Sequence, residues 1–206
     1  MDLQEQKEVS AHFERMFTKN IKPWREHGPE PLLLSFLKLL KEKSTDDKGL
    51  NVLDIGCGDG WVSLLAAREG NMAWGIDSSE TAIAQAKETA KNSSFADRVH
   101  FQVGDALYLP FEKAQFYALI DRGLFHHILP ENRSLYLKNI RRVLKPKSYF
   151  YLSVFSDKNS PGFGQLFNQL LIEKIFGKDF TVLKCYEDPF PPYVPAHLLH
   201  FIFERK

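Results

Sequence analysis

The strongest constraint on the fold of this chain is an apolar strand that runs directly into a glycine-rich turn. The segment VLDIGCGDG spans residues 52–60, and its second half has glycine at every other position. Glycine allows positive φ angles and lets a ligand approach the backbone closely. The helix expected from Trp61 would direct the positive end of its dipole at this turn. The pattern predicts a strand–turn–helix unit whose turn either reverses the chain or holds a ligand.

Strand and helix patterns alternate after this unit. Apolar runs predict strands at residues 51–55, 71–76, 99–103, 116–121 and 149–155. Helical spacing predicts helices at residues 61–69, 79–91 and 130–144, with Ser78 or Ser79 capping the second and Pro146 ending the third. This alternation indicates a parallel sheet with helices on both faces.

Both ends of the chain depart from the alternation. Helices are expected at residues 3–18 and 31–43, separated by a proline-rich break. A helix at 165–176 precedes strands at 180–186 and 197–204, which have no helical pattern between them and therefore favour an antiparallel pair. We expect one domain over residues 1–206, with residues 1–48 as an N-terminal helical cap and residues 49–206 as the α/β core.

Composition excludes several classes of protein. The 206 residues are 44% hydrophobic and 26% charged with a net charge of +1, which is ordinary for a soluble domain and lacks the basic surplus typical of nucleic-acid binding. Cys57 and Cys185 form neither a disulfide framework nor a metal-ligand spacing, so we expect no metal. No apolar run approaches the roughly 20 residues that span a bilayer. A cytoplasmic location without a membrane or nucleic-acid partner is expected, and the oligomeric state stays open.

The glycine turn does not fit two phosphate-binding patterns. A dinucleotide fingerprint needs its third glycine where Trp61 stands, and a P-loop needs a lysine followed by Ser or Thr. The turn instead has an acidic residue at the strand end followed by G-x-G-x-G. Because of this motif, the stretch from about Leu50 to Phe155 resembles the class I S-adenosylmethionine-dependent methyltransferase family. The resemblance implies a Rossmann-like α/β fold: a mostly parallel seven-stranded sheet with an antiparallel last strand, helices on both faces, and S-adenosylmethionine as the cofactor.

Three acidic residues end three successive predicted strands: Asp54, Asp77 and Asp105. Ligands of open α/β sheets bind at this carboxyl edge, although each residue alone could be a helix cap. The resemblance implies that Asp77 accepts the ribose hydroxyls and that Asp105 and the Ala106 amide hold the adenine. We expect cofactor contacts from Trp24, Asp54, Gly56, Cys57, Gly58, Gly60, Asp77, Ser78, Asp105, Ala106 and Asp121. Cys57 is interpreted as a small buried side chain and not as a nucleophile.

The segment after the fourth predicted strand carries the catalytic candidates. Its Asp-Arg-Gly string at 121–123 resembles the thiopurine and related thiol methyltransferase branch, which differs in its glycine loop. Arg122 could stabilise a thiolate or simply pair with a carboxylate. His126 or His127 could take a proton, although neighbouring side chains point differently and either ring could be structural.

These observations predict methyl transfer from S-adenosylmethionine to a small-molecule acceptor, possibly a thiol or other soft nucleophile. Phe13, Phe17 and Trp24 could cover that acceptor or only anchor the first helix, and residues 156–164 could border it. Two alternatives stay open: a methyltransferase that acts on protein or RNA, and a non-catalytic module that binds S-adenosylmethionine.

Overall fold

The computed structural model describes residues 3–23, 28–45, 48–160, 164–188 and 196–206. Its seven strands form one sheet in the order β3-β2-β1-β4-β5-β7-β6. The strands are β1 (Asn51–Ile55), β2 (Met72–Asp77), β3 (Val99–Val103), β4 (Phe116–Arg122), β5 (Leu144–Phe155), β6 (Phe180–Glu187) and β7 (Leu198–Arg205). The strands from β1 to β5 pair in parallel, and β7 is antiparallel to both β5 and β6. The expected sheet, with its antiparallel last strand, is confirmed.

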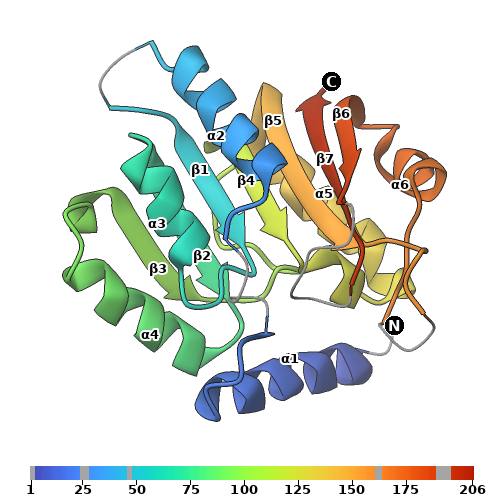
Figure 1. Cartoon of the computed structure of the whole chain (residues 1–206), viewed down its shortest axis with the longest axis horizontal. Coiled ribbons are helices and arrows are strands. Elements are labelled where there is room, and N and C mark those ends of the chain that lie inside the picture. The colour runs from blue at the N-terminus through green and yellow to red at the C-terminus, as the bar shows by residue number, and fades with distance from the viewer. Residues whose placement is uncertain (1–2, 24–27, 46–47, 161–163, 189–195) are drawn as a thin grey trace.

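Helices cover both faces of this sheet (Figure 1). On one face lie α2 (Pro31–Lys43), α3 (Trp61–Arg68) and α4 (Glu80–Lys91), and on the other lie α5 (Arg133–Val143) and α6 (Gln169–Phe176). The remaining helix, α1 (Leu3–Thr18), covers neither face and crosses the edge where the parallel strands end. The short 3-10 turns η2 (Ala96–Arg98), η3 (Phe125–His127) and η4 (Pro130–Asn132) lie in the connections.

The period-2 alternation of strand side chains builds a separate core on each face. In β4, Ala118 and Ile120 pack in the cluster with α2, α3 and α4, whereas Leu119 packs in the cluster with α5 and α6. The same alternation continues at the end of β4. Asp121 and Arg122 are therefore expected to leave the strand on opposite faces, and this decides which of them reaches the site.

Two expected helices begin later than their sequence pattern suggested. The first turn of the helix expected at 130–144 is η4, and α5 follows it and ends at Val143. The helix expected at 165–176 begins at Gln169, because the Asn168 side chain accepts a hydrogen bond from Leu171 N at 2.9 Å and caps it there. Within the described residues, no helix combines the length and the apolar character that crossing a bilayer requires.

Strand β5 begins earlier than expected and contains Pro146. The ladder between β4 and β5 changes register between Phe116 and Ala118, whose partners on β5 are Leu144 and Tyr149. Pro146 therefore lies opposite an irregular stretch of β4, where a residue without an N–H donor is tolerated.

We predict that Gly60→Ala destabilises the fold more than Gly70→Ala, although both glycines have positive φ angles of 79° and 95°. A Cβ at Gly60 would lie 2.5 Å from the Phe101 ring, whereas a Cβ at Gly70 meets nothing within 4 Å. Holding alanine in a left-handed backbone conformation lowers the free energy of unfolding by about 1–2 kcal/mol in both variants. Only Gly60→Ala adds an overpacking cost of roughly 1–3 kcal/mol. Urea unfolding of both variants measures the difference; equal losses would contradict the packing role of Gly60.

Candidate cofactor and acceptor site

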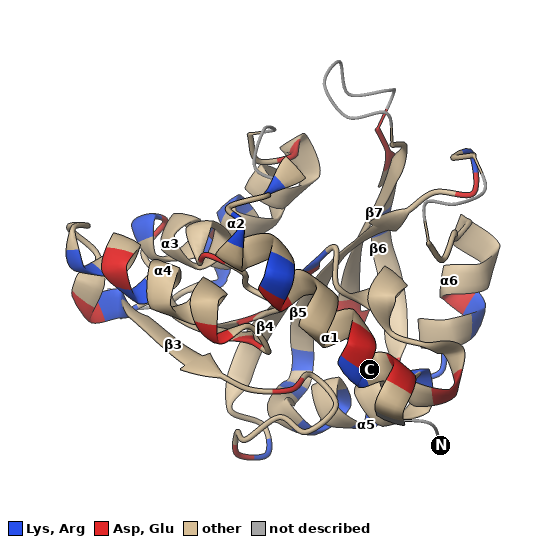
Figure 2. Cartoon of the chain, turned by 90° about the horizontal axis from the view of Figure 1, so that it is seen from below, with Lys and Arg blue, Asp and Glu red and all other residues tan. Residues whose placement is uncertain are grey.

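A cavity of about 460 Å³ opens at the carboxyl ends of β1 to β4, under α1. Most of the residues expected at the site from the sequence line it. They are Asp54, Gly56, Cys57, Gly58, Asp77, Ser78, Asp105, Ala106, Arg122, His126 and His127. Viewed from below, α1 lies in front of the strand ends that form this edge (Figure 2). The carboxyl edge of the sheet and α1 therefore bound one shared space.

Asp77 joins the glycine turn to the start of α4. Its two carboxylate oxygens accept hydrogen bonds from Gly58 N at 2.8 Å and from Ser79 N at 2.9 Å. Ser79 in turn caps α4 by accepting a hydrogen bond from Ala82 N at 2.9 Å. Burial raises the pKa of Asp77, while the two backbone hydrogen bonds lower it. One carboxylate thus fixes both the turn and the end of β2 beside the cavity.

Asp54 is the most deeply buried carboxylate in the cavity lining, with 2% of its surface exposed. Its Oδ2 accepts a hydrogen bond of 2.6 Å from the Ser63 hydroxyl on α3. Burial raises the pKa of Asp54 to about 7, and the negative charges of Asp77 and Asp121 add to this effect. A cation placed near Asp54 would reverse the shift, so the site favours a positively charged ligand group.

Asp105 and Ala106 lie at the outer end of the cavity. Asp105 Oδ1 accepts a hydrogen bond from Leu107 N at 2.8 Å, which shapes the turn after β3. The Asp105 side chain is nevertheless exposed, and both residues line the cavity. Asp105 can therefore both shape this turn and contact a ligand, the two roles that the sequence allowed.

Three expected cofactor residues are not part of the described cavity lining. Gly60 is the N-cap of α3, and its missing Cβ leaves room for Phe101 and Ala86. Asp121 is fully buried on the α5 face, and Trp24 lies outside the described residues. Packing and strand alternation direct Gly60 and Asp121 away from the described cavity lining, and their expected cofactor contacts stay predictions.

Asp121 instead organises the chain after β4. Its Oδ1 accepts hydrogen bonds from Leu124 N at 2.9 Å and from Phe125 N at 3.1 Å, and its Oδ2 accepts one from the Tyr136 hydroxyl at 2.5 Å. Burial raises the pKa of Asp121 to about 6, against these three hydrogen bonds. The carboxylate therefore holds η3, and with it the two histidines, against α5.

Arg122 leaves β4 on the opposite face and is already paired. Its guanidinium contacts Glu30, with Nη2 at 2.6 Å and Nε at 2.8 Å from Oε1, and lies 4.9 Å from the Trp61 ring centroid. Glu30 is the N-cap residue of α2, 92 positions away in the chain, and is 6% exposed. The sequence allowed two roles for Arg122, stabilising a thiolate or pairing with a carboxylate. The structure shows its ion pair with the Glu30 carboxylate.

His126 and His127 form an aromatic wall beyond the glycine turn. The His126 ring stacks on Phe155 with centroids 3.9 Å apart, and the Phe13 ring meets His127 edge-on at 4.8 Å. Burial lowers the pKa of His126 well below its ordinary value, and the neighbouring His127 adds to this. Burial also lowers the pKa of His127, to about 4. Both imidazoles are therefore neutral near pH 7.

Helix α1 is attached to this site by two polar side chains that the sequence patterns did not reveal. The Gln6 amide donates to His127 O at 3.0 Å and accepts from Leu129 N at 3.0 Å. Glu14 accepts hydrogen bonds from the Ser79 and Thr81 hydroxyls at the start of α4. These contacts join the helix to both sides of the cavity, where Phe13 and Phe17 line its roof.

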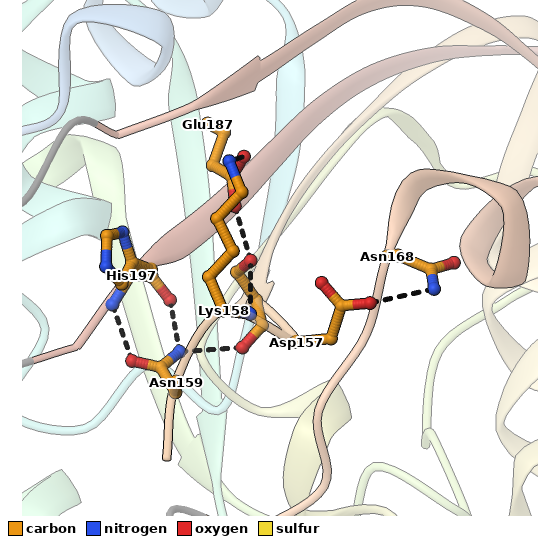
Figure 3. Close-up of polar contacts among 7 residues, drawn as sticks. Asp157, Lys158, Asn159, Asn168, Glu187 and His197 are labelled. Carbon is orange, nitrogen blue, oxygen red and sulfur yellow. Dashed lines mark hydrogen bonds and ion pairs between the residues drawn. The ribbon is translucent and has the colours of Figure 1, made fainter.

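The far wall is held by the segment that follows β5 (Figure 3). The Asn159 side chain accepts a hydrogen bond from His197 N and donates one to His197 O, both at 2.7 Å. Lys158 pairs with Glu187 in the same cluster. The residues on either side of His197, Ala196 and Leu198, line the cavity. The part of the 156–164 segment that the structure describes is thus attached to the cavity wall that Ala196 and Leu198 form.

Comparison with known proteins identifies the family. The family model described as a methyltransferase domain matches residues 46–183, well over half of the chain. The chain belongs to the class I S-adenosylmethionine-dependent methyltransferase family.

Two curated relatives and one solved structure extend this result. The chain is 32% identical over 139 residues to a 2-heptyl-1-hydroxyquinolin-4(1H)-one methyltransferase of Mycobacteroides abscessus, covering 68% of this chain and 58% of the relative. It is 33% identical over 148 residues to a demethylmenaquinone methyltransferase of Listeria welshimeri, with 68% and 60% covered. The chain therefore spans about three fifths of the length of these relatives. A Burkholderia thailandensis 1,6-didemethyltoxoflavin-N1-methyltransferase shares the fold, with a TM-score of 0.79, 21% identity, and 98% and 90% of the two chains covered.

We predict that Asp54→Asn weakens the pH dependence of stability. Burial raises the pKa of Asp54 from 3.8 to about 7 in the folded chain, so its stabilising contribution is complete below pH 3.8 and is lost as pH rises through 7. Between pH 5 and 8 the unmutated chain should lose roughly 2 kcal/mol more than the variant, whose amide keeps an acceptor for Ser63. Urea unfolding at both pH values tests this, and parallel losses would show that Asp54 is not the responsible group.

We also predict that Asn159→Ala makes the cavity wall around His197 more mobile. The variant loses both hydrogen bonds to the His197 backbone, at a cost of about 1–3 kcal/mol, and the His197 amide should exchange its hydrogen faster. Hydrogen exchange measured by mass spectrometry reports on this segment. The matched control is Asn92→Ala, which removes an exposed side-chain hydrogen bond to Glu88 O. Unchanged exchange at His197 would remove the positioning role of Asn159.

Proposed function

We propose that this chain transfers a methyl group from S-adenosylmethionine to a small-molecule acceptor. The observation that carries the proposal is the Asp77 carboxylate, which fixes the glycine turn and the end of β2 beside a cavity with a largely apolar lining. When bound, S-adenosylmethionine supplies a methyl group on a positively charged sulfur.

The residues of the cavity fit that cofactor by their chemistry. The cofactor contains no phosphate, and the glycine turn has no lysine to bind one. Its cationic and hydroxyl groups suit a lining that includes Asp54, Asp77 and Asp105. The assignment of Asp77 to the ribose, and of Asp105 and Ala106 to the adenine, follows the family resemblance and is part of this proposal. We propose no contact for Gly60 or Asp121.

The residues of this chain position the acceptor and exclude water from the cavity. Residues 1–48 are predicted to cap the α/β core of residues 49–206, and we propose that α1 has this role because Gln6 and Glu14 hold it over the cavity, whereas α2 packs on a face of the sheet. Phe13 and Phe17 in this cap present rings to the cavity. An apolar roof would exclude water and hold the acceptor in line with the methyl group.

A small, apolar acceptor with fused rings fits the far end of this cavity. The curated relatives are named for a hydroxyquinolone and for demethylmenaquinone, which supports acceptors of that kind. A sulfur acceptor stays a prediction from the weaker resemblance. The structure offers it little support, because the Arg122 charge that would stabilise a thiolate is compensated by Glu30.

Calorimetric titration with S-adenosylhomocysteine tests the proposal. We expect Asp77→Asn and Asp105→Asn each to weaken binding roughly tenfold or more, because each removes a charged hydrogen-bond acceptor. Asp97→Asn, an exposed position on η2 outside the cavity lining, should bind as the parent does. Unfolding temperatures of all three variants separate lost contacts from lost structure.

Two results would contradict parts of the proposal. If the unmutated chain does not bind S-adenosylhomocysteine, the cofactor assignment is wrong. If it binds but transfers no labelled methyl group to any member of a panel of fused-ring hydroxyl, amine and thiol compounds, the chain is a cofactor-binding module.

A further inference from the structure

One face of α1 presents a stripe of side chains along the cavity. Its members all line the cavity: Gln6, Val9, Ser10, Phe13 and Phe17. Phe17 lies at the glycine turn, where a Cβ on Gly58 would be 3.1 Å from its ring. Gln6, at the other end of the stripe, bonds the backbone of His127 and Leu129. Because α1 crosses the sheet edge toward α4, as Figure 1 shows, a position along the helix corresponds to a position along the cavity.

Ser10 faces the end of the cavity that lies away from the glycine turn. It follows Gln6 by about one helical turn and precedes Phe13, whose ring meets His127 edge-on at 4.8 Å. The centroid of the His127 ring lies 6.3 Å from that of Phe155. The lining of this end, which we call the acceptor end, also includes Ile128, Ala196 and Leu198. Ser10 is partly exposed in this largely apolar lining, so a bound molecule can reach its side chain.

The Ser10 hydroxyl is held weakly within its own helix. Thr18, Ser35 and Thr89 each donate to the carbonyl four residues earlier at 2.9 Å, and all three bonds lie at exposed positions. Ser10 donates to Gln6 O at 3.4 Å, beyond the range of about 2.5–3.0 Å that is typical of O–H···O bonds. A helical carbonyl also accepts the backbone N–H four residues later, so the Ser10 hydroxyl can turn away without leaving Gln6 O unsatisfied.

The polar side chains around Ser10 are already engaged by the protein. Both polar atoms of the Gln6 side chain make hydrogen bonds of 3.0 Å to backbone groups. Arg122, which also lines the cavity, is paired with Glu30. Among these groups, Ser10 has the hydrogen-bond donor that a ligand can redirect at the lowest cost.

We infer that Ser10 is a specificity-determining residue, whose hydroxyl donates a hydrogen bond to a carbonyl oxygen of a neutral acceptor. This inference rests on the proposed function and names a contact of that same site. A carbonyl that enters an apolar lining loses its hydration, and this costs free energy unless a protein donor replaces the water. The hydroxyl of Ser10 supplies that donor from the roof of the cavity.

A single donor on the roof also orients the acceptor. The carbonyl is not the reacting group, and its hydrogen bond to α1 selects which edge of the molecule faces the methyl group. Apolar side chains such as Phe155 and Leu198 offer no competing donor for the carbonyl. A few placed polar groups in a mainly apolar pocket are the usual source of orientation and selectivity.

The inference is tested with two fused-ring probes that differ in one carbonyl, 1-tetralone and tetralin. Both are titrated by ligand-observed NMR into the complex with S-adenosylhomocysteine and into the chain alone. We expect Ser10→Ala to weaken 1-tetralone binding roughly fivefold, the net effect of one neutral hydrogen bond, and to change tetralin binding by less than about twofold. The difference between the two probes separates a lost hydrogen bond from a general change in the cavity.

Two further variants make the test specific. Ser35→Ala is the matched control, because it removes an exposed hydroxyl that makes the same bond to the carbonyl four residues earlier. It should change the binding of neither probe. Ser10→Thr keeps a hydroxyl and should retain the affinity for 1-tetralone that Ser10→Ala loses, which a purely structural role would not produce. Circular dichroism confirms that each variant is folded.

The outcomes separate this inference from the proposed function. Equal effects of Ser10→Ala on the two probes, or an unchanged affinity for 1-tetralone, would overturn the inference. So would failure of 1-tetralone to bind the unmutated chain. Failure of S-adenosylhomocysteine to bind overturns the proposed function instead, and the titrations of the chain alone still decide whether Ser10 contacts the carbonyl.

Discussion

The two hydrogen bonds accepted by Asp77 connect the parts on which the rest of the site depends. Gly58 belongs to the turn after β1 and Ser79 to the start of α4, and a single carboxylate accepts from the backbone N–H of both. Backbone amides at such a turn need an acceptor, and a carboxylate provides one that binds strongly. These two hydrogen bonds therefore fix the position of the turn relative to β2 and α4.

Strand alternation places the last two residues of β4 on opposite faces of the sheet. Asp121 points to the α5 face and holds the backbone of η3, whereas Arg122 points to the α2 face and lines the cavity. The two neighbours thus work on different sides of the sheet, and each is satisfied by a partner from a helix: Tyr136 from α5 and Glu30 from the N-cap of α2. Asp121 thereby fixes the start of the turn that carries the two cavity-lining histidines of η3.

Local patterns predicted the order of the strands and helices, though not all of their bounds, and the acidic residues of the cavity lining. Alternating strands and helices predicted the sheet, and the acidic strand ends predicted Asp54, Asp77 and Asp105 at one edge, because parallel strands end together. Gly60 shows the limit of a glycine pattern. The same residue type serves a close ligand and a close side chain, and only the position of Phe101 shows that packing is the reason here.

Contacts between segments that are distant in the chain could not be predicted from the sequence. Nothing in the pattern joins Glu30 to Arg122 across 92 positions, or Gln6 to the backbone of His127 and Leu129 across 121 and 123 positions. Such pairs depend on where helices dock, and docking is decided by the whole apolar surface of the sheet. The face to which Asp121 points, by contrast, could have been deduced by counting alternate positions along β4, since Ile120 and Leu119 already define the two sides.

The electrostatics of the cavity change from one end to the other, and this gradient suits a cationic donor and a neutral acceptor. One end of the cavity has carboxylates whose pKa values are raised by burial, most clearly that of Asp54. The acceptor end has two neutral imidazoles and an arginine already paired with Glu30. The carboxylates therefore suit the cationic sulfur of the proposed donor, and described walls whose one arginine is already paired suit a neutral acceptor.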